Sequence, residues 1–191
     1  MHVQPLSVPG PLLLTPHQYP DRRGRFYESF NPHDFAAATG LDVDFVQDNH
    51  SESHQGVLRG LHYQLPPHTQ GKLVRVVAGE VYDVVVDLRH GSATFGRWAA
   101  ARLNAADARQ LWIPPGFAHG FLTLSEQSIL LYKTTRHYRP EAERCLRWDD
   151  PGLAIPWPLA DAPILSARDQ DGEFLDALES IALNGESGAR G

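Results

Sequence analysis

The sequence predicts a mainly β fold, a β-sandwich or small barrel with a few short peripheral helices. At least eight short apolar segments, separated by turn signals, fill residues 45–135. The stretch VAGEVYDVVVDLR places Ala78-Gly79-Glu80 between two β-branched runs, which is the pattern of a hairpin. The successive valines at 84–86 indicate a strand that is buried on both faces.

The predicted strands follow one another at short spacing. They cover residues 45–49, 57–64, 72–77, 81–88, 98–103, 110–113, 120–124 and 129–135. A short helix is predicted just before them, in NPHDFAAATG. Asn31 suits its N-cap, Pro32 its first position and Gly40 its end.

A second helix is predicted near the C-terminus, in DGEFLDALESIAL. Phe174, Leu178 and Ile181 share one face at helical spacing, with acidic residues opposite. The final residues, NGESGARG, are expected to fray. We therefore expect one domain over residues 1–183 and a flexible tail over 184–191.

Charge and composition exclude several classes of partner. The formal net charge is -6 and no Lys/Arg-rich run occurs, which argues against a nucleic-acid or anionic-membrane partner but allows a small anionic ligand. The single cysteine, Cys145, excludes an intrachain disulfide. No segment has the composition of a secretion signal or the length of a membrane span. A reduced, cytoplasmic compartment is expected.

Strand alternation directs several polar side chains toward the interior of the predicted sheets. A purely structural barrel would fill its interior with valine, isoleucine and leucine, so a polar interior indicates a ligand site. The residues that fall on these inward faces are Gln47, Asn49, His62, Gln64, Lys72 and Tyr132.

Arg59 is out of phase with His62 under strict alternation, although both lie in GVLRGLHYQL. Gly60 between them could permit a bulge that turns both side chains inward. If Arg59 faces away from the cavity of His62, a ligand-binding role for Arg59 fails.

Two stretches resemble the motifs of the cupin fold. GLHYQLPPHTQGKLVRVVAGE resembles the first motif and WIPPGFAHGF, which contains His119, resembles the second. A metal-binding cupin offers His-x-His and a downstream Glu, whereas this chain has Gln64 in the second position and Lys72 further on. A divalent metal wants about three or four N, O or S ligands, and an ammonium would repel it. The altered motif argues against a metal pair.

Proton chemistry suits these groups better. A histidine is a base near neutral pH, a lysine stabilises an oxyanion, and a tyrosine can donate a proton. His62, Lys72 and Tyr132 together fit proton abstraction beside a carbonyl, and reprotonation on the other face would epimerise the carbon. Asp169 could hold the imidazole tautomer. Each residue also has a structural alternative: His62 and Tyr132 as core residues, and Lys72 as the flank of a turn.

The chain resembles the dTDP-4-dehydrorhamnose 3,5-epimerase family over nearly all of residues 3–170. The resemblance rests on the ordered series DRRGRFYE, FVQDNHSESHQGVLRGLHYQ, KLVRVVAGEVYDVVVDLR, SATFGRW, QLWIPPGFAHGFLTL, YKTTRHYRPEAE, RWDDPGLAIPWP and PILSARD. Any one motif is weak, but eight in order are highly specific. The resemblance implies a cupin-type jelly roll.

The resemblance also implies roles for individual residues. His62 would remove protons from the carbons beside a 4-keto group, polarised by Asp169. Lys72 would stabilise the enolate oxygen, and Tyr132 would reprotonate from the far face. Arg59 would bind the diphosphate. Residues matching other substrate-contact positions are Arg23, Glu28, Gln47, Asn49, His119, Tyr138, Glu143 and Arg168.

Partners and cofactors follow from the same resemblance. It implies a dTDP-sugar substrate, no metal or organic cofactor, and a homodimer whose N-terminal strands cross to the partner. DRRGRFYE would then serve the neighbouring subunit's site. The chain departs from the family pattern at His137-Tyr138, where an aromatic pair is common, and at Arg168, where lysine is common.

Three alternatives remain open at this point. The first is a mono-epimerase of a related dTDP-4-keto-6-deoxy sugar. The second is a metal-dependent cupin oxygenase or isomerase. The third is a non-catalytic module that binds a sugar nucleotide.

Overall fold

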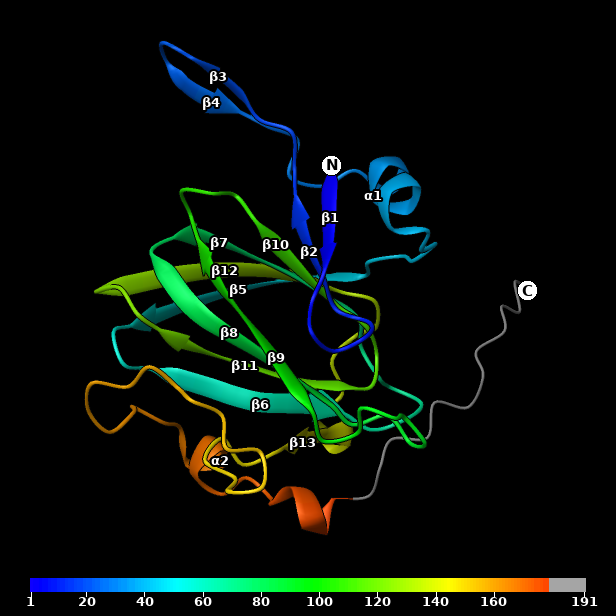
Figure 1. The fold of residues 1–191 in the computed structure, drawn as a ribbon, viewed down its shortest axis with the longest axis vertical. Helices are drawn as coiled ribbons and strands as arrows, with labels where there is room; N and C mark the ends of the chain where they lie inside the picture. Colours follow the sequence, from blue (N-terminus) through cyan, green and yellow to red (C-terminus); the bar gives the residue numbers. More distant parts are fainter. Residues whose placement is uncertain (179–191) are drawn as a thin grey trace.

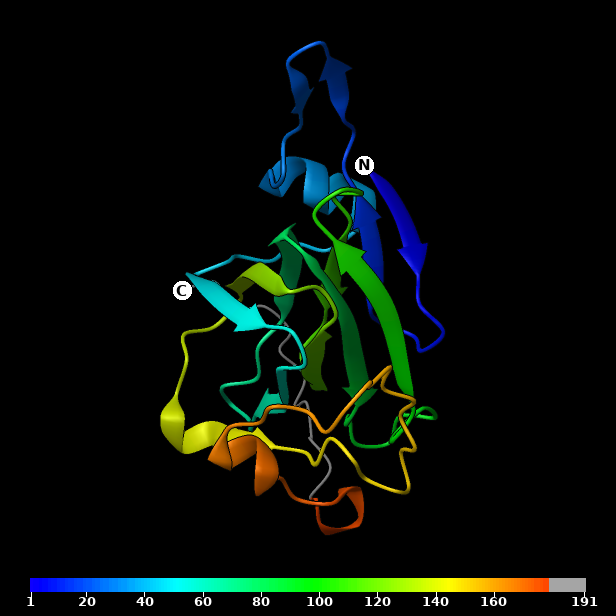
Figure 2. The same cartoon turned by 90° about the vertical axis from the view of Figure 1, so that its left-hand side faces the viewer.

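A computed structural model describes residues 1–178 as two packed antiparallel β-sheets with a small hairpin and short helices at the periphery (Figures 1 and 2). The strands are β1 (His2–Pro5), β2 (Leu12–Thr15), β3 (Tyr19–Asp21), β4 (Gly24–Phe26), β5 (Gln47–His54), β6 (Leu58–Gln64), β7 (Lys72–Ala78), β8 (Glu80–Asp87), β9 (Trp98–Asn104), β10 (Gln110–Ile113), β11 (Phe117–Thr123), β12 (Gln127–Thr134) and β13 (Glu143–Cys145). The helices are α1 (Pro32–Thr39) and α2 (Ala167–Gln170), with 3-10 turns at η1 (Pro140–Ala142) and η2 (Leu175–Ala177).

The prediction of a mainly β fold is confirmed. One sheet has the order β1-β2-β10-β7-β12-β5 and the other β13-β6-β11-β8-β9, while β3 and β4 form a separate hairpin. All eight predicted strands are present, with ends shifted by a few residues. The short strands β1–β4 and β13 were not predicted. Their three or four residues are too few for a clear alternation.

The space between the sheets is apolar along much of its length. Inward side chains of both sheets meet there, including Val74, Val85, Leu111, Phe121 and Leu130. The outer face of the five-stranded sheet is covered by C-terminal segments that pack on Val84 and Val86. Because both faces of this sheet are covered, the valines at 84–86 are all fully buried, as predicted.

The predicted helix after Asn31 is confirmed as α1. The Asn31 side chain accepts from the backbone N–H of His33 and Asp34, and Gly40 ends the helix with φ 72°. Phe35 anchors α1 on the outer face of the six-stranded sheet beside Trp112.

The predicted C-terminal helix is wrong within the described residues, where only the single turn η2 forms. Backbone groups of this segment bond to distant partners instead: Glu173 to Cys145 and Arg147, and the Leu175 N–H to Asp150 Oδ2 at 2.7 Å. The rest of that helix and the tail at 184–191 lie outside the described residues. None of the helices within residues 1–178 has the length and hydrophobicity that a membrane-spanning helix needs.

Candidate active site

Two adjoining cavities of about 280 Å³ and 370 Å³ open between the sheets. Four side chains line both of them: His62, Lys72, Tyr132 and Glu143. A larger hollow of about 430 Å³ is lined mainly by the opposite face of the six-stranded sheet and includes neither His62 nor Lys72. The two inner cavities are therefore the ones that contain His62 and Lys72 together with Tyr132.

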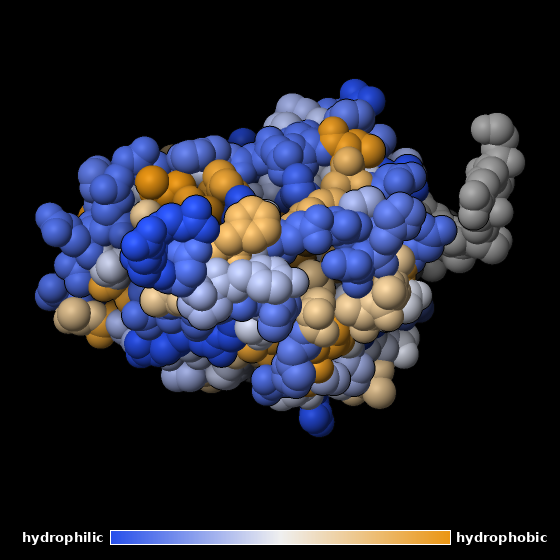
Figure 3. Space-filling model, turned by 90° about the horizontal axis from the view of Figure 1, so that it is seen from above, coloured by the Kyte–Doolittle hydropathy of each residue, from blue (hydrophilic) through white to orange (hydrophobic). Residues whose placement is uncertain are grey.

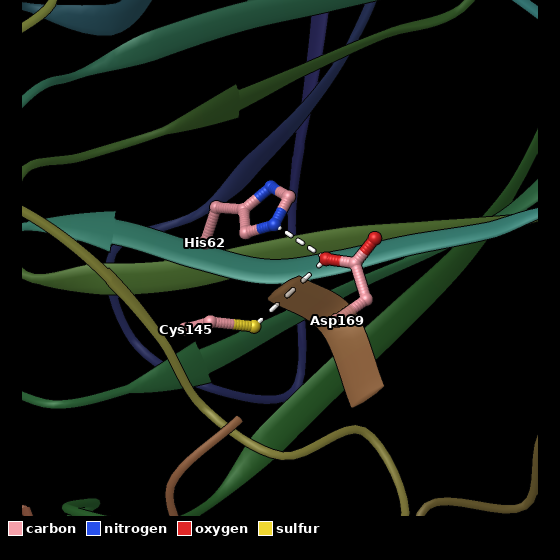
Figure 4. Close-up of side chains that lie close together, drawn as sticks. All are labelled: His62, Cys145 and Asp169. Atoms are coloured by element: carbon pink, nitrogen blue, oxygen red, sulfur yellow. Dashed lines mark hydrogen bonds and ion pairs between the residues drawn. The ribbon is translucent and has the colours of Figure 1, made fainter. Parts of the chain in front are cut away.

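His62 pairs with Asp169 (Figure 4). Its Nε2 is 2.6 Å from Asp169 Oδ1, although the two residues are 107 positions apart in the chain. An ionised carboxylate can only accept hydrogen bonds, so Nε2 carries the proton and Nδ1 keeps a lone pair. Figure 4 shows the second ring nitrogen pointing away from Asp169. His62 is thus held in the tautomer of a base.

Asp169 is buried at the start of α2, with 3% of its surface exposed. Its Oδ1 also accepts from the Gly60 N–H at 3.3 Å, and its Oδ2 accepts from Ser166 Oγ at 2.7 Å. Burial alone would raise the pKa of Asp169, but the hydrogen bonds from His62 and Ser166 outweigh it and lower the pKa below its ordinary value. A charged Asp169 can stabilise the imidazolium that forms when His62 takes a proton.

Lys72 begins β7 on the opposite sheet, and its Nζ lies 3.3 Å from the backbone oxygen of His62. Only 8% of Lys72 is exposed. This burial lowers its pKa to about 8, against the opposing effect of the Asp83 charge. Lys72 therefore places an ammonium beside His62 that titrates close to the neutral range.

Asp83, which was not predicted from the sequence, also belongs to the site because it contacts His119 and affects Lys72. It is fully buried in β8, and both of its carboxylate oxygens lie 3.0 Å from His119 Nε2. A signal was present in the sequence, because Asp83 is an acid inside a run of buried valines and shares the inward face with Val81 and Val85. Asp83 orients His119, which lines the larger inner cavity.

Tyr132 lies on β12 of the six-stranded sheet, whereas His62 lies on β6 of the five-stranded sheet. Burial raises the pKa of Tyr132, opposed by the positive charge of Arg59. The phenol therefore keeps its proton at neutral pH. A ligand in the cavity would lie between a base from one sheet and a phenolic acid from the other.

Arg59 lines the same cavity as His62. This is the arrangement that a bulge at Gly60 was expected to produce. His119 of β11 pairs with His62, and Phe121 of β11 pairs with Arg59. The two paired positions are three residues apart on β6 but two residues apart on β11, so β6 has one extra residue here, as in a β-bulge. The Arg59 Nε donates to Ser53 Oγ at 2.9 Å. Ser53 was another residue that sequence reasoning missed.

The smaller cavity has a rim of hydrogen-bonded polar groups. Tyr138 Oη donates to Glu143 Oε2 at 2.6 Å, and Arg168 pairs with the same oxygen. Gln47 donates to Asn49 Oδ1 at 2.8 Å and accepts from the Tyr138 N–H. These predicted ligand-contact residues are therefore brought together at one end of the site.

Among the predicted site residues, Asp169 and Arg168 line neither inner cavity but bond to His62 and Glu143, which do. Arg23 and Glu28 are the predicted site residues without such a link to the cavities of their own chain. Neither lines either inner cavity. Arg23 lies in the turn of the projecting β3–β4 hairpin, with 84% of its side chain exposed, and pairs with Asp21 (Figure 1). Glu28 is exposed and accepts from Asn31.

His62, Cys145 and Asp169 are the types of residue that bind metal ions, and their ligand atoms lie within 4.8 Å of one another. His62 and Asp169 have the geometry of a hydrogen-bonded acid–base pair, which differs from that of two metal ligands. Ligands bonded to zinc at about 2.0–2.2 Å in a tetrahedron are separated by roughly 3.3–3.6 Å, whereas His62 Nε2 and Asp169 Oδ1 are 2.6 Å apart. Burial raises the pKa of the Cys145 thiol to about 12, so it stays protonated.

Comparison with known proteins identifies the family. The sequence profile of the dTDP-4-dehydrorhamnose 3,5-epimerases matches residues 5–177. The chain belongs to the dTDP-4-dehydrorhamnose 3,5-epimerase family. An enzyme of that name from Pseudomonas aeruginosa is 57% identical over 173 residues, which are 90% of this chain and 95% of the relative.

Solved structures of the epimerase family have the same fold. The Legionella pneumophila dTDP-6-deoxy-D-glucose-3,5-epimerase, in complex with dTDP-4-keto-L-rhamnose, superposes with a TM-score of 0.90 at 46% identity, covering 93% of this chain and 94% of that one. A 3'-monoepimerase from Streptomyces bikiniensis, in complex with dTDP-quinovose, gives 0.85 at 38% identity, covering 92% and 88%. The cupin-type fold expected from the resemblance is confirmed.

The two positions expected to depart from the epimerase-family pattern differ in their contacts. Arg168 forms an ion pair with Glu143, which lines both inner cavities. His137 is exposed and lines neither inner cavity, whereas Tyr138 lines the smaller one. Both departures leave His62, Lys72, Tyr132 and Asp169 unchanged.

Proposed function

We propose that the chain epimerises dTDP-4-dehydro-6-deoxy-D-glucose at carbons 3 and 5, giving dTDP-4-dehydro-L-rhamnose. One observation carries the proposal: His62, which is hydrogen-bonded to Asp169, and Tyr132 line one cavity from opposite sheets. Inversion of a carbon needs a base on one face and an acid on the other. The relatives at about half identity that bear the 3,5-epimerase name support the same reaction.

The first half of the reaction removes a proton. His62 Nδ1 takes it from carbon 3, the C–H bond breaks, and its electron pair forms a C3–C4 double bond while the carbonyl pair moves to oxygen 4. The Lys72 ammonium stabilises this enolate oxygen, and Asp169 stabilises the imidazolium.

The second half returns a proton to the opposite face. Enolate electrons re-form the carbonyl as carbon 3 takes the proton of the Tyr132 hydroxyl. The imidazolium and the phenolate then return to their starting forms by proton exchange with solvent, and the same steps invert carbon 5. No metal or organic cofactor takes part in this scheme.

Binding is assigned to the remaining groups of the two cavities. Arg59 carries a planar guanidinium that suits the oxygens of the diphosphate. His119 contacts the sugar, held by Asp83. The residues at the rim that contact the nucleotide are Gln47, Asn49, Tyr138, Glu143 and Arg168.

Solvent exchange tests the function. The protein is incubated with dTDP-4-dehydro-6-deoxy-D-glucose in deuterated water, and the product is examined for deuterium. We expect uptake at both carbon 3 and carbon 5. Uptake at carbon 3 alone would replace the proposal with the mono-epimerase, and no uptake would favour a binding module. Stoichiometric iron, manganese or zinc by elemental analysis would favour the metal-dependent alternative.

The pH dependence of turnover tests Lys72. We expect kcat/KM to fall as the pH rises through about 8, because Lys72 of the free enzyme loses its positive charge above its pKa. Asp83→Asn should move this fall to lower pH, because it removes the negative charge that raises the pKa of Lys72. Steady-state rates from about pH 6 to pH 10 measure the effect. An unchanged kcat/KM across this range would contradict the role of Lys72.

We also propose a homodimer in which the β3–β4 hairpin of each subunit reaches the partner's site. The hairpin projects from the two sheets and buries little of itself: Tyr19 is 58% exposed and Phe26 is 71% exposed. Figure 3, seen from the hairpin side, shows apolar patches within a largely hydrophilic surface. A second copy would cover these side chains and bring Arg23 and Glu28 to a ligand.

Mixing two inactive variants tests this arrangement. Arg23→Ala and His62→Ala should each be impaired alone, and mixing them with subunit exchange should restore activity. A hybrid dimer has one site with an intact His62 and an intact Arg23 from the other subunit. If mixing gives no gain although hybrids form, Arg23 does not act across the interface.

Two further expectations remain proposals. We take residues 1–183 as one domain, which the continuous sheets support for the described part of the chain. We assign the enzyme to the cytoplasm, and the free Cys145 is consistent with a reducing compartment.

A further inference from the structure

Ser166 contacts Asp169 twice. It is the N-cap of α2, where its Oγ accepts from the Asp169 N–H at 3.2 Å. The same hydroxyl donates to Asp169 Oδ2 at 2.7 Å. Backbone and carboxylate of Asp169 are therefore both tied to one side chain.

The second contact fixes how the carboxylate faces His62. Oδ1 accepts from His62 and from the Gly60 N–H, whereas Ser166 is the donor to Oδ2 within the described part of the chain. Asp169 is 3% exposed, so water has little access to Oδ2. Without the Ser166 hydroxyl, a buried charged oxygen would lose its donor, and the carboxylate could turn to share Oδ2 with the donors of Oδ1.

We propose that Ser166 is a positioning residue for the epimerisation, which holds Asp169 so that Oδ1 meets His62 Nε2. Ser166 lines neither inner cavity and thus acts on the reaction through Asp169. The inference rests on the proposed function, in which His62 is the base. The geometry of such a pair affects the rate, because a misplacement of about 1 Å can lower a rate by roughly 100-fold.

A purely structural role is the alternative, since Ser166 also caps a helix. Three variants separate the two roles. Ser166→Ala loses cap and donor, Ser166→Gly keeps most of the capping preference but has no donor, and Ser166→Thr keeps both. The free energy of unfolding should depend on how well residue 166 caps the helix, so Ser166→Ala should be the least stable variant. Turnover should depend on the hydroxyl donor, so Ser166→Ala and Ser166→Gly should be equally impaired.

Kinetics give the decisive measurement. For Ser166→Ala and Ser166→Gly we expect kcat to fall about 10- to 100-fold, with KM within about twofold, and Ser166→Thr to stay near wild type. Ser92→Ala is the matched control. Ser92 likewise donates to a buried carboxylate, Asp87 Oδ2 at 2.6 Å, and accepts from a backbone N–H. The side-chain partners of Asp87 are Arg89, Ser92 and Thr94, so this carboxylate does not act on His62. The kcat of Ser92→Ala should not change.

The low-field imidazole N–H resonance of His62 adds a readout that needs no substrate. It should shift or broaden in Ser166→Gly and remain in Ser92→Ala, with His62→Ala as the assignment control. An unchanged resonance together with an unchanged kcat in Ser166→Gly would overturn the inference. A wild-type protein with no solvent exchange on any 4-keto sugar nucleotide would instead overturn the proposed function, and the resonance would still report on Ser166.

Discussion

His62→Ala is expected to lower kcat by about 10³-fold or more, because general acid–base catalysis typically contributes roughly 10²–10⁴. The substitution removes the base and leaves the other cavity-lining groups in place. Binding of dTDP should therefore change by only a few-fold. Turnover by product analysis and affinity by calorimetry measure the two quantities separately.

A matched histidine variant controls for the His62 result. His54 is exposed at the end of β5 and lines neither inner cavity, so His54→Ala should keep wild-type kcat. If His62→Ala retained more than about a tenth of wild-type turnover, that loss would be below the typical range for a general base, and His62 would not be the base. A large loss of dTDP affinity would instead make His62 mainly a binding group.

Gly60→Ala is expected to destabilise the protein by about 3 kcal/mol or more and to abolish activity. A Cβ on Gly60 would lie 2.5 Å from Gly120 Cα and 2.8 Å from the His119 oxygen, both backbone atoms. Gly60 also has φ 120°, which side chains other than glycine rarely adopt. Relief of the clash would push β6, which carries both Arg59 and His62, away from β11.

Gly56→Ala is the control for backbone conformation alone. Gly56 has φ 77°, but nothing lies within 4 Å of a Cβ built on it. We expect it to cost only about 1–2 kcal/mol and to keep activity. Urea unfolding of both variants measures the difference. Equal losses of unfolding free energy in the two variants would show that the close approach of β6 and β11 contributes nothing to the cost of Gly60→Ala.

Much of the candidate site was predictable because strand alternation is a local property. The pattern placed His62, Lys72 and Tyr132 on inward faces, and all three line the inner cavities. The α1 helix was predictable for the same reason, since Asn31 and Gly40 satisfy its ends with their own neighbours.

The errors occurred where distant segments compete with local preference. DGEFLDALESIAL has helical spacing, yet Glu173 bonds to Cys145 and Arg147, and these bonds replace helical ones within the described residues. Asp83 was overlooked because a buried acid is stable only with a partner, and His119 comes from another strand.

By itself, the sequence determined the strands, their inward faces and the membership of the epimerase family. The 2.6 Å contact between His62 and Asp169, and the absence of Arg23 from the cavities of its own chain, depend on the tertiary structure. The two kinds of feature differ in the sequence separation over which they are set. Alternation is set by neighbouring residues, whereas a hydrogen bond across 107 positions depends on how the sheets, the bulge at Gly60 and α2 pack together.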